Sequence, residues 1–407
     1  MQTTLQSGCS LQRIIENIHY IMAKYEIRNG IAIIPEDETI IAREAFRNCE
    51  ELTSVLIPHS VTEIRALAFY GCTGLTSIVI PKSVVAIAYD AFTGCSNLNS
   101  IVVEDGNPVY DSRENCNAII EKRSSTLVRG CSTTTIPEGI EIIGNSAFSN
   151  CKGLTSIALP SSITAIKNNA FFDCTELAEL FIPKNLTQIG CNDVFANCKG
   201  LTSIVVEDGN PVYDSRGNCN AIIENGEKLI LGCCNSIIPN GVRTIARSAF
   251  SGCAITSATI PDTVVTIEAY AFSHCSMLSE VVIPNDVETI EHGAFAESGL
   301  VDVVVPEKVR NLHGVFCRCH ELITATVKGK LDDFRSDCTF PFMDCSSLES
   351  ITFLDCVRYI KDESCNGCKS LKNIYVPAKK GDYYKKRFTE ELHSIIIELE
   401  PVKKTKK

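Results

Sequence analysis

The 407-residue sequence contains no tryptophan, and its basic residues are outnumbered by its acidic ones, 38 against 49. A nucleic-acid-binding surface needs a basic stripe that neutralises phosphates, and a formal net charge of −11 offers none by default. The only basic run is the tail from Lys403 to Lys407, which is typical of a solvated chain end. The composition therefore predicts no nucleic-acid partner.

Long apolar runs are also missing. No stretch of 18 or more apolar residues occurs, so we expect no membrane-spanning segment. The first 25 residues do not have the pattern of a signal peptide, because Arg13, Glu16 and Lys24 interrupt the apolar stretch. Apolar residues between Leu11 and Tyr25 instead recur at helical spacing, which predicts an amphipathic helix that covers one end of the core.

Local catalytic signatures are absent as well. The sequence has no G-x-S-x-G, no phosphate-binding glycine loop and no H-E-x-x-H. Its seven histidines are scattered and form no recognisable Cys/His or Ser/His arrangement. We therefore assign no catalytic residue and no cofactor, and we interpret the chain as non-enzymatic. An enzyme whose catalytic residues are distant in sequence is the least favoured alternative.

One repeated pattern fills most of the chain. The motif A-F-x-x-C occurs at Phe46, Phe69 and Phe92 in steps of 23 residues and continues to Phe342, and Cys365 takes the Phe position in a twelfth copy. The consensus is L-x-x-I-x-I-P-x-x-V-x-x-I-x-x-x-A-F-x-x-C-x-x. A unit this short cannot bury its apolar residues alone, so consecutive coils must stack around one core. The segment L-x-x-I-x-I predicts a strand that pairs in parallel with its counterpart in the next coil.

This period and consensus resemble the BspA-like subfamily of leucine-rich-repeat proteins, whose coils carry A-F-x-x-C-x-x-L-x-x-I-x-I-P. The resemblance covers about residues 29–378 and departs from the family at Cys365, at Ser298 and between Lys328 and Cys338. We expect a β-rich solenoid, a leucine-rich-repeat fold of about twelve 23-residue coils with a parallel sheet on one face, two hairpin insertions and small end caps.

The expected domain boundaries follow the repeat. An N-terminal helical cap occupies residues 1–28, the solenoid residues 29–378, and a C-terminal cap with a basic tail residues 379–407. Longer repeats with hairpins are expected at 98–148 and 201–250. A short helix and a strand are expected in the C-terminal cap.

Eleven of the 22 cysteines share the place three residues after the Phe position. They are Cys49, Cys72, Cys95, Cys151, Cys174, Cys198, Cys253, Cys275, Cys319, Cys345 and Cys368. Stacked coils place equivalent side chains about 4.8 Å apart and parallel, whereas a disulfide needs Cβ atoms about 3.8 Å apart. This spacing favours a ladder of buried free thiols, which suits a reducing setting. Zinc bound by Cys365-x-x-Cys368 or Cys317-x-Cys319 lacks a second ligand pair, so we assign no metal site.

A stretch of 21 residues occurs twice, at 101–121 and 204–224, and differs only at Glu114 and Gly217. Asp105-Gly106 and Asn107-Pro108 are turn dipeptides, so we expect the chain to leave the sheet there. Asn225-Gly226 then predicts a tight hairpin turn in the second copy. A calcium loop with Asp105, Asn107 and Asp111 as ligands is the alternative, but the spacing of an EF-hand is missing.

Two lanes of side chains are expected to face solvent on the sheet, because residues of a strand alternate between its faces. The polar lane contains Ser54, Ser77, Ser100, Ser156, Glu179, Ser203, Ser257, Glu280, Asp302, Thr324, Ser350 and Asn373. The apolar lane contains Leu56, Val79, Val102, Ala158, Phe181, Val205, Thr259, Val282, Val304, Thr326, Thr352 and Tyr375.

The apolar lane has two interpretations. Small and β-branched residues suit a tight parallel ladder without any partner. An extended apolar surface with a polar rim also marks partner sites on soluble proteins. If a partner binds, we expect it at the residues whose larger or charged side chains break the uniformity of the lanes: Glu179, Phe181, Glu280, Val282, Asp302 and Val304.

The leading functional hypothesis is a noncatalytic scaffold that binds a protein or glycan partner through the sheet face. The resemblance to BspA-like proteins implies cell adhesion and a cell-surface or secreted location, although a shared fold does not fix function. The alternative is an intracellular protein-interaction module in the cytoplasm, favoured by the missing signal peptide and the number of thiols.

Overall fold

The computed structural model describes residues 25–331, 341–357 and 362–400. The chain divides into two compact units, Met1–Gly200 (unit 1) and Leu201–Lys407 (unit 2). Most of the segment expected as the N-terminal helical cap, and the basic tail from Lys403, lie outside the described residues. Of that cap segment, Glu26–Arg28 form strand β1, which pairs antiparallel with β2 (Ile31–Ile33).

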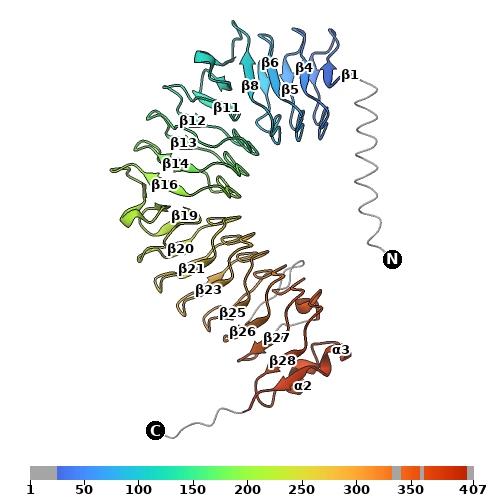
Figure 1. Ribbon diagram of the computed structural model, residues 1–407, viewed down its shortest axis with the longest axis vertical. Coiled ribbons are helices and arrows are strands. Elements are labelled where there is room, and N and C mark those ends of the chain that lie inside the picture. Colours follow the sequence, from blue (N-terminus) through green and yellow to red (C-terminus); the bar gives the residue numbers. More distant parts are fainter. Residues whose placement is uncertain (1–24, 332–340, 358–361, 401–407) are drawn as a thin grey trace. The chain divides into compact units, whose positions relative to one another are not determined.

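Each regular coil contributes a longer strand, a corner that follows the repeat proline, and a strand of two residues. The longer strands of unit 1 are β2, β4 (Ser54–Leu56), β6 (Ser77–Ile80), β8 (Ser100–Val103) and β14 (Glu179–Ile182). The short ones are β3 (Ile40–Ile41), β5 (Glu63–Ile64), β7 (Ala86–Ile87), β12 (Ile142–Ile143), β13 (Ala165–Ile166) and β15 (Gln188–Ile189). Both sets pair in parallel, and β4, β6 and β8 lie side by side in Figure 1. The sequence predicted the first set; the second ladder is an additional finding.

Unit 2 repeats this design. Its longer strands are β16 (Ser203–Val206), β21 (Ser257–Thr259), β23 (Glu280–Val282), β25 (Asp302–Val305), β26 (Thr324–Val327), β27 (Ser350–Phe353) and β28 (Asn373–Val376). Its short strands are β20 (Thr244–Ile245), β22 (Thr266–Ile267) and β24 (Thr289–Ile290). A 3-10 turn, η3 (Asp362–Cys365), occupies the coil in which Cys365 replaces Phe.

The C-terminal end contains α2 (Gly381–Lys385), α3 (Glu390–His393) and β29 (Ile396–Glu398), so it has two short helices where the sequence predicted one. Strand β29 pairs in parallel with β28 and extends the sheet by one strand. Tyr384 is fully buried, and its ring stacks on Phe353 at 5.6 Å. These elements cover core that the last coil would otherwise expose.

The two copies of the repeated stretch form hairpins, but the hairpins are part of the solenoid wall. In unit 1 the elements are β9 (Tyr110–Asp111), η1 (Arg113–Asn115), β10 (Ala118–Glu121) and β11 (Thr126–Gly130). In unit 2 they are β17 (Tyr213–Asp214), η2 (Arg216–Asn218), β18 (Ala221–Glu224) and β19 (Lys228–Gly232). Strands β11 and β19 pair in parallel with β12 and β20 of the short-strand ladders.

The chain leaves the sheet of β8 here, as expected, but the hairpin joins the short-strand ladder instead of standing apart from the coils. Ile119 and Ile120 are fully buried, because the apolar side chains of the hairpin complete the core of an additional coil. The solenoid consequently has about 15 turns rather than twelve, since these coils lack the A-F-x-x-C motif used for counting. Asn225 and Gly226, with φ of 49° and 75°, form the tight turn that their dipeptide predicts.

A ladder of stacked phenylalanine rings in the core helps to hold the regular coils in register. Phenylalanine rings stack with nearly parallel planes, for example Phe46 on Phe69 at 5.1 Å and Phe272 on Phe295 at 5.2 Å. At the hairpin coils the ladder ends on glycine: a Cβ on Gly130 would lie 2.2 Å from the Phe148 ring. A repeated buried corner of this kind tolerates little change in side-chain volume.

Candidate binding surface

The apolar lane of unit 1 is exposed and continuous over its first coils. Ile33, Leu56, Val79 and Val102 occupy equivalent places on β2, β4, β6 and β8, and they are between 41% and 59% exposed. The register pairs Ile33 with Leu56 and Val79 with Val102, so neighbouring side chains stand about one strand spacing apart. This row is a flat apolar surface, bordered by half-buried serines of the polar lane.

The six residues singled out from the sequence lie on three strands. Glu179 and Phe181 belong to β14 in unit 1, where Phe181 is 47% exposed. Unit 2 brings the other four together on β23 and β25, which belong to consecutive coils. Glu280 and Asp302 hold the same place on these two strands, and so do Val282 and Val304, which are 67% and 45% exposed. Unit 2 therefore places two carboxylates beside two apolar side chains.

Two members of the apolar lane were missed in the sequence. Ile33 lies in the first coil, before the first A-F-x-x-C motif, and Ile237 lies in the coil made by the second hairpin. Both directly precede an Ile-Pro pair, Ile34-Pro35 and Ile238-Pro239, as lane residues do in regular coils. Counting coils from the proline instead of the phenylalanine identifies both.

The cysteine ladder has a hydrogen-bonding role that the sequence did not reveal. Eight of the eleven ladder thiols donate to the carbonyl oxygen of the Phe in the preceding coil, for example Cys72 to Phe46 at 2.9 Å and Cys275 to Phe250 at 3.0 Å. Cys253, which follows a hairpin coil, donates to the carbonyl oxygen of Gly232 instead. All cysteines in the described part of the chain are free thiols. A cysteine here packs as a small apolar side chain and still satisfies a buried carbonyl, which alanine and valine cannot do.

Burial makes these thiols unreactive. It raises the pKa of Cys95 to about 11 and the pKa of Cys198 and Cys275 to about 12. Since the thiolate is the metal ligand and the nucleophile, protonated thiols of this kind do neither task near neutral pH. Cys319 and Cys368, members of the two candidate zinc pairs, donate to Phe295 and Phe342 as ordinary members of the ladder. In the described residues no three His, Cys, Asp or Glu side chains converge as metal ligands.

The repeated stretch uses its polar side chains for structure. Asn107 is 1% exposed, and its amide nitrogen donates to the carbonyls of Pro81 and Val84 in the preceding coil. Its amide oxygen accepts from the backbone of Val109 and Tyr110. The oxygen that a calcium ion would need is thus directed at backbone N–H groups.

Asp111, another residue of the calcium alternative, is also engaged. Its carboxylate forms a bidentate pair with Arg113, with N–O distances of 2.9 and 2.8 Å. In unit 2 Asp214 and Arg216 form the same pair, which lowers the pKa of Asp214 through the hydrogen bonds from Arg216. The stretch therefore braces the hairpin in both units.

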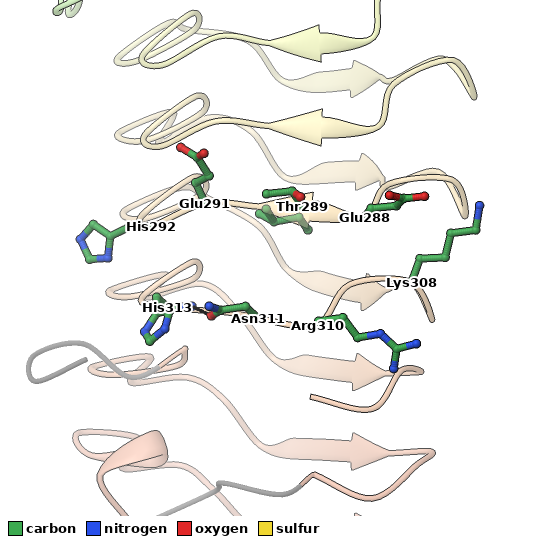
Figure 2. A pocket seen from close by; sticks show the side chains of 9 residues that line it. Glu288, Thr289, Glu291, His292, Lys308, Arg310, Asn311 and His313 are labelled. Atoms are coloured by element: carbon green, nitrogen blue, oxygen red, sulfur yellow. Dashed lines mark hydrogen bonds between the residues drawn. The ribbon is translucent and has the colours of Figure 1, made fainter. Parts of the chain in front are cut away.

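A hollow of about 860 Å³, lined mostly by residues with charged or polar side chains, lies beside the edge strand β24 in unit 2 (Figure 2). Lys308 and Arg310 lie at one end of the hollow, and His292 and His313 at the other. The hollow follows from a break in pairing: the backbone N–H of His313 donates to Asn311 Oδ1 at 3.1 Å, and β24 is the last strand of its sheet in the described residues.

The charges around this hollow have local partners. Lys308 Nζ lies 2.6 Å from Asp286, and Arg310 donates to the carbonyl of Lys330 at 3.3 Å. The walls of the hollow contain carboxylates, imidazoles and cations in a mixed arrangement, together with the hydroxyl-bearing Thr289. Among the residues that the structure describes, no helix is long and apolar enough to cross a membrane.

Comparisons with known proteins agree with this architecture. A family model described as BspA type leucine rich repeat region matches in 6 copies over residues 25–118, 125–216, 231–323 and 313–393. A leucine rich cell surface protein from Faecalibacterium prausnitzii A2-165 is 27% identical, with a TM-score of 0.57 over 88% of this chain and 90% of that one. The pneumococcal vaccine antigen PcpA is 21% identical, with a TM-score of 0.61 over 93% of this chain and 97% of that one. None of the curated proteins matches the chain.

Proposed function

The chain belongs to the BspA-type leucine-rich-repeat family, and from this premise we propose that it is a noncatalytic scaffold that binds a protein partner through the apolar lane of its sheets. The observation that carries the proposal is the row of in-register apolar side chains from Ile33 to Val102, about half of whose surface is exposed. Monomeric soluble proteins seldom expose contiguous apolar rows unless a partner covers them.

The chemistry of the lane favours a protein over a glycan. Sugar rings are commonly held by aromatic side chains together with polar groups that hydrogen-bond to hydroxyls. The lane contains valine, leucine, isoleucine and threonine with Phe181 and Tyr375 as its aromatic members, and the sequence has no tryptophan. An apolar centre with a polar rim is instead the general layout of protein–protein interfaces.

For location we propose the cell surface, with adhesion as the role. The support is the similarity to the Faecalibacterium protein, which is described as a cell surface protein. Fractionation of producing cells, followed by protease treatment of intact cells, tests this location. Recovery of the chain solely from the cytosol, protected from protease, favours the intracellular interaction module instead.

Binding is tested with a matched pair of variants. Val79→Asp places a charge in the apolar lane, whereas Val85→Asp makes the same change at a residue of similar exposure beside the short strand β7. The immobilised full chain is offered purified extracellular-matrix proteins and, separately, a lysate of producing cells. We expect specific partners to be lost with Val79→Asp and kept with Val85→Asp. Equal retention by both folded variants would reject the lane as the binding surface.

A further inference from the structure

A crevice opens on the apolar lane of unit 2, between β21 and the preceding coil, and Ser236, Ser257 and Thr259 contribute hydroxyl groups to its walls. Its volume is about 160 Å³, and its apolar lining comes from Ile237, Ile238, Phe250, Ile255 and Ala258. No charged side chain lines it. Strand β21 pairs with β23 on one side, and on its other side the segment at Ile237 forms no strand in the described structure.

The crevice has an identifiable cause in the sequence. The coil after Phe250 is one residue shorter than the coil after Phe148, with 11 residues instead of 12 up to the repeat proline. Ala258 also occupies the inward place that Ile157 fills in unit 1. Ala258 is half-buried where Ile157 is buried, so the missing side-chain volume is replaced by open space.

At the rim of the crevice, unit 2 has a larger side chain than unit 1, whereas at the inward place it has a smaller one. Ile237 is 66% exposed and stands where unit 1 carries Thr135. Val282, which pairs in register with Thr259, is 67% exposed on the other side of the crevice. The two most exposed aliphatic residues of the lane in unit 2 therefore lie at and next to a hollow whose inner side chains are apolar, as anchor pockets in protein interfaces are.

Size and charge define the occupant. A cavity of about 150 Å³ has the volume of one benzene ring, and the crevice is of that size. The crevice therefore suits one aromatic or large aliphatic side chain. Glu280 pairs in register with Ser257 at the rim, so an exposed carboxylate lies one strand from the entrance. Asp302 holds the equivalent place on β25, one strand further away, where its carboxylate accepts a hydrogen bond from Thr324. A basic residue next to the apolar anchor complements them.

We propose that this crevice is the anchor pocket of the binding surface: it receives a single Phe-, Leu- or Met-sized side chain of a protein partner, with a lysine or arginine beside it held by Glu280 and Asp302. The inference rests on the proposed function, since it specifies which part of the lane holds the partner and what the partner must present.

The pocket is tested first without any partner, with benzene as the probe and the full chain as the receptor. We expect saturable benzene binding, followed by methyl NMR shifts of unit 2. Ala258→Ile fills the crevice as Ile157 does in unit 1, and it should weaken benzene binding at least tenfold while keeping the melting temperature the same or higher. Ala254→Ile adds the same bulk at an exposed residue of the same coil and should leave binding unchanged. Absent benzene saturation, or equal binding by the Ala258 variant, overturns the proposal.

The partner chemistry is tested by panning a display library of twelve-residue peptides on the full chain. We expect recovered peptides to share one large apolar residue with a lysine or arginine within two positions, and to bind Ala258→Ile at least tenfold more weakly. Glu280→Lys should weaken them about threefold or more, less so at high salt. Peptides that bind both variants like the parent overturn the proposal. A partner lost with Val79→Asp but kept with Ala258→Ile also overturns it and leaves the scaffold function intact, whereas a partner kept by both variants rejects the scaffold surface itself.

Discussion

A buried arginine gives the sharpest test of how this core is stabilised. Arg129 on β11 is 2% exposed, and its Nη1 donates to the carbonyls of Ser146 and Ser149 at 3.1 and 3.2 Å. Its Nε and Nη2 are buried and have no hydrogen-bond partner among the described residues. The second hairpin carries Leu231 at the same place, also buried, so the same environment accepts an aliphatic side chain.

We expect Arg129→Leu to leave the free energy of unfolding unchanged or to raise it by up to about 3 kcal/mol. Each buried unsatisfied donor costs about 1–3 kcal/mol, and replacing a buried charge by an apolar side chain of similar size is commonly neutral or stabilising. The two hydrogen bonds from Nη1 oppose this gain, because bonds from charged groups contribute about 1.5–3 kcal/mol each. We expect the change in the free energy of unfolding to be positive or zero, because the variant removes two unpaired buried nitrogens and a buried charge.

The assay is guanidinium chloride unfolding followed by far-ultraviolet circular dichroism, since the chain has no tryptophan to report by fluorescence. Arg129→Met serves as a second variant that keeps a long side chain and avoids a cavity. Leu231→Arg is the reverse change and should destabilise the chain by about 3–5 kcal/mol, as an uncompensated buried charge does. If both Arg129 variants lower stability by more than about 1 kcal/mol, the guanidinium stabilises the core and the reasoning is refuted.

Three further predictions concern the hairpin and the thiols. Glu114 has φ of 57°, in the left-handed region, and the second copy has Gly217 at this place. Glu114→Gly should therefore relieve backbone strain and stabilise the chain by about 0.5–1 kcal/mol in the same unfolding assay. A loss of stability would contradict the presence of strain at Glu114. Asn107→Ala removes four hydrogen bonds of a buried amide and should lower the free energy of unfolding by about 2–4 kcal/mol. Asn107→Asp keeps the accepting oxygens but loses the two bonds donated to the preceding coil. Its loss of stability therefore measures how much of the effect comes from those two donated bonds. Burial raises the pKa of Cys95 to about 11 and of Cys198 to about 12, so the folded state favours protonated thiols. Their contribution to stability should be complete just below about pH 9 and be lost between about pH 9 and 12. Melting temperatures measured across this range check it, and a flat profile would show that ionising these thiols does not limit stability.

The scaffold interpretation joins these features. The Phe and Cys ladders fix the coils, so residues between two prolines can vary on the surface without loss of register. A surface built on such a rigid sheet presents its side chains with little entropic cost on binding. The lane residues can therefore change to suit a binding partner without disturbing the packing of the coils.

The repeat pattern made much of the fold predictable. Burial at Phe69 and Cys72, and exposure at Val79, follow from their places in the consensus, because a coil of fixed length repeats one environment. The same logic identified a free-thiol ladder without any coordinates. It did not identify the hydrogen bond from most of these thiols to the Phe carbonyl of the preceding coil, since that bond depends on the direction of a side chain across two coils.

The sequence by itself determined the solenoid, the positions of its longer strands and the outward lanes, because these are properties of a local period. Only the tertiary structure decided that the two hairpins form coils of the wall, since the pairing of β11 with β12 joins an insertion to the next regular coil. It also decided that Ala258 leaves a hollow and that Arg129 is enclosed. A period predicts what each coil repeats, whereas cavities and buried charges arise where two neighbouring coils differ in length or side-chain volume.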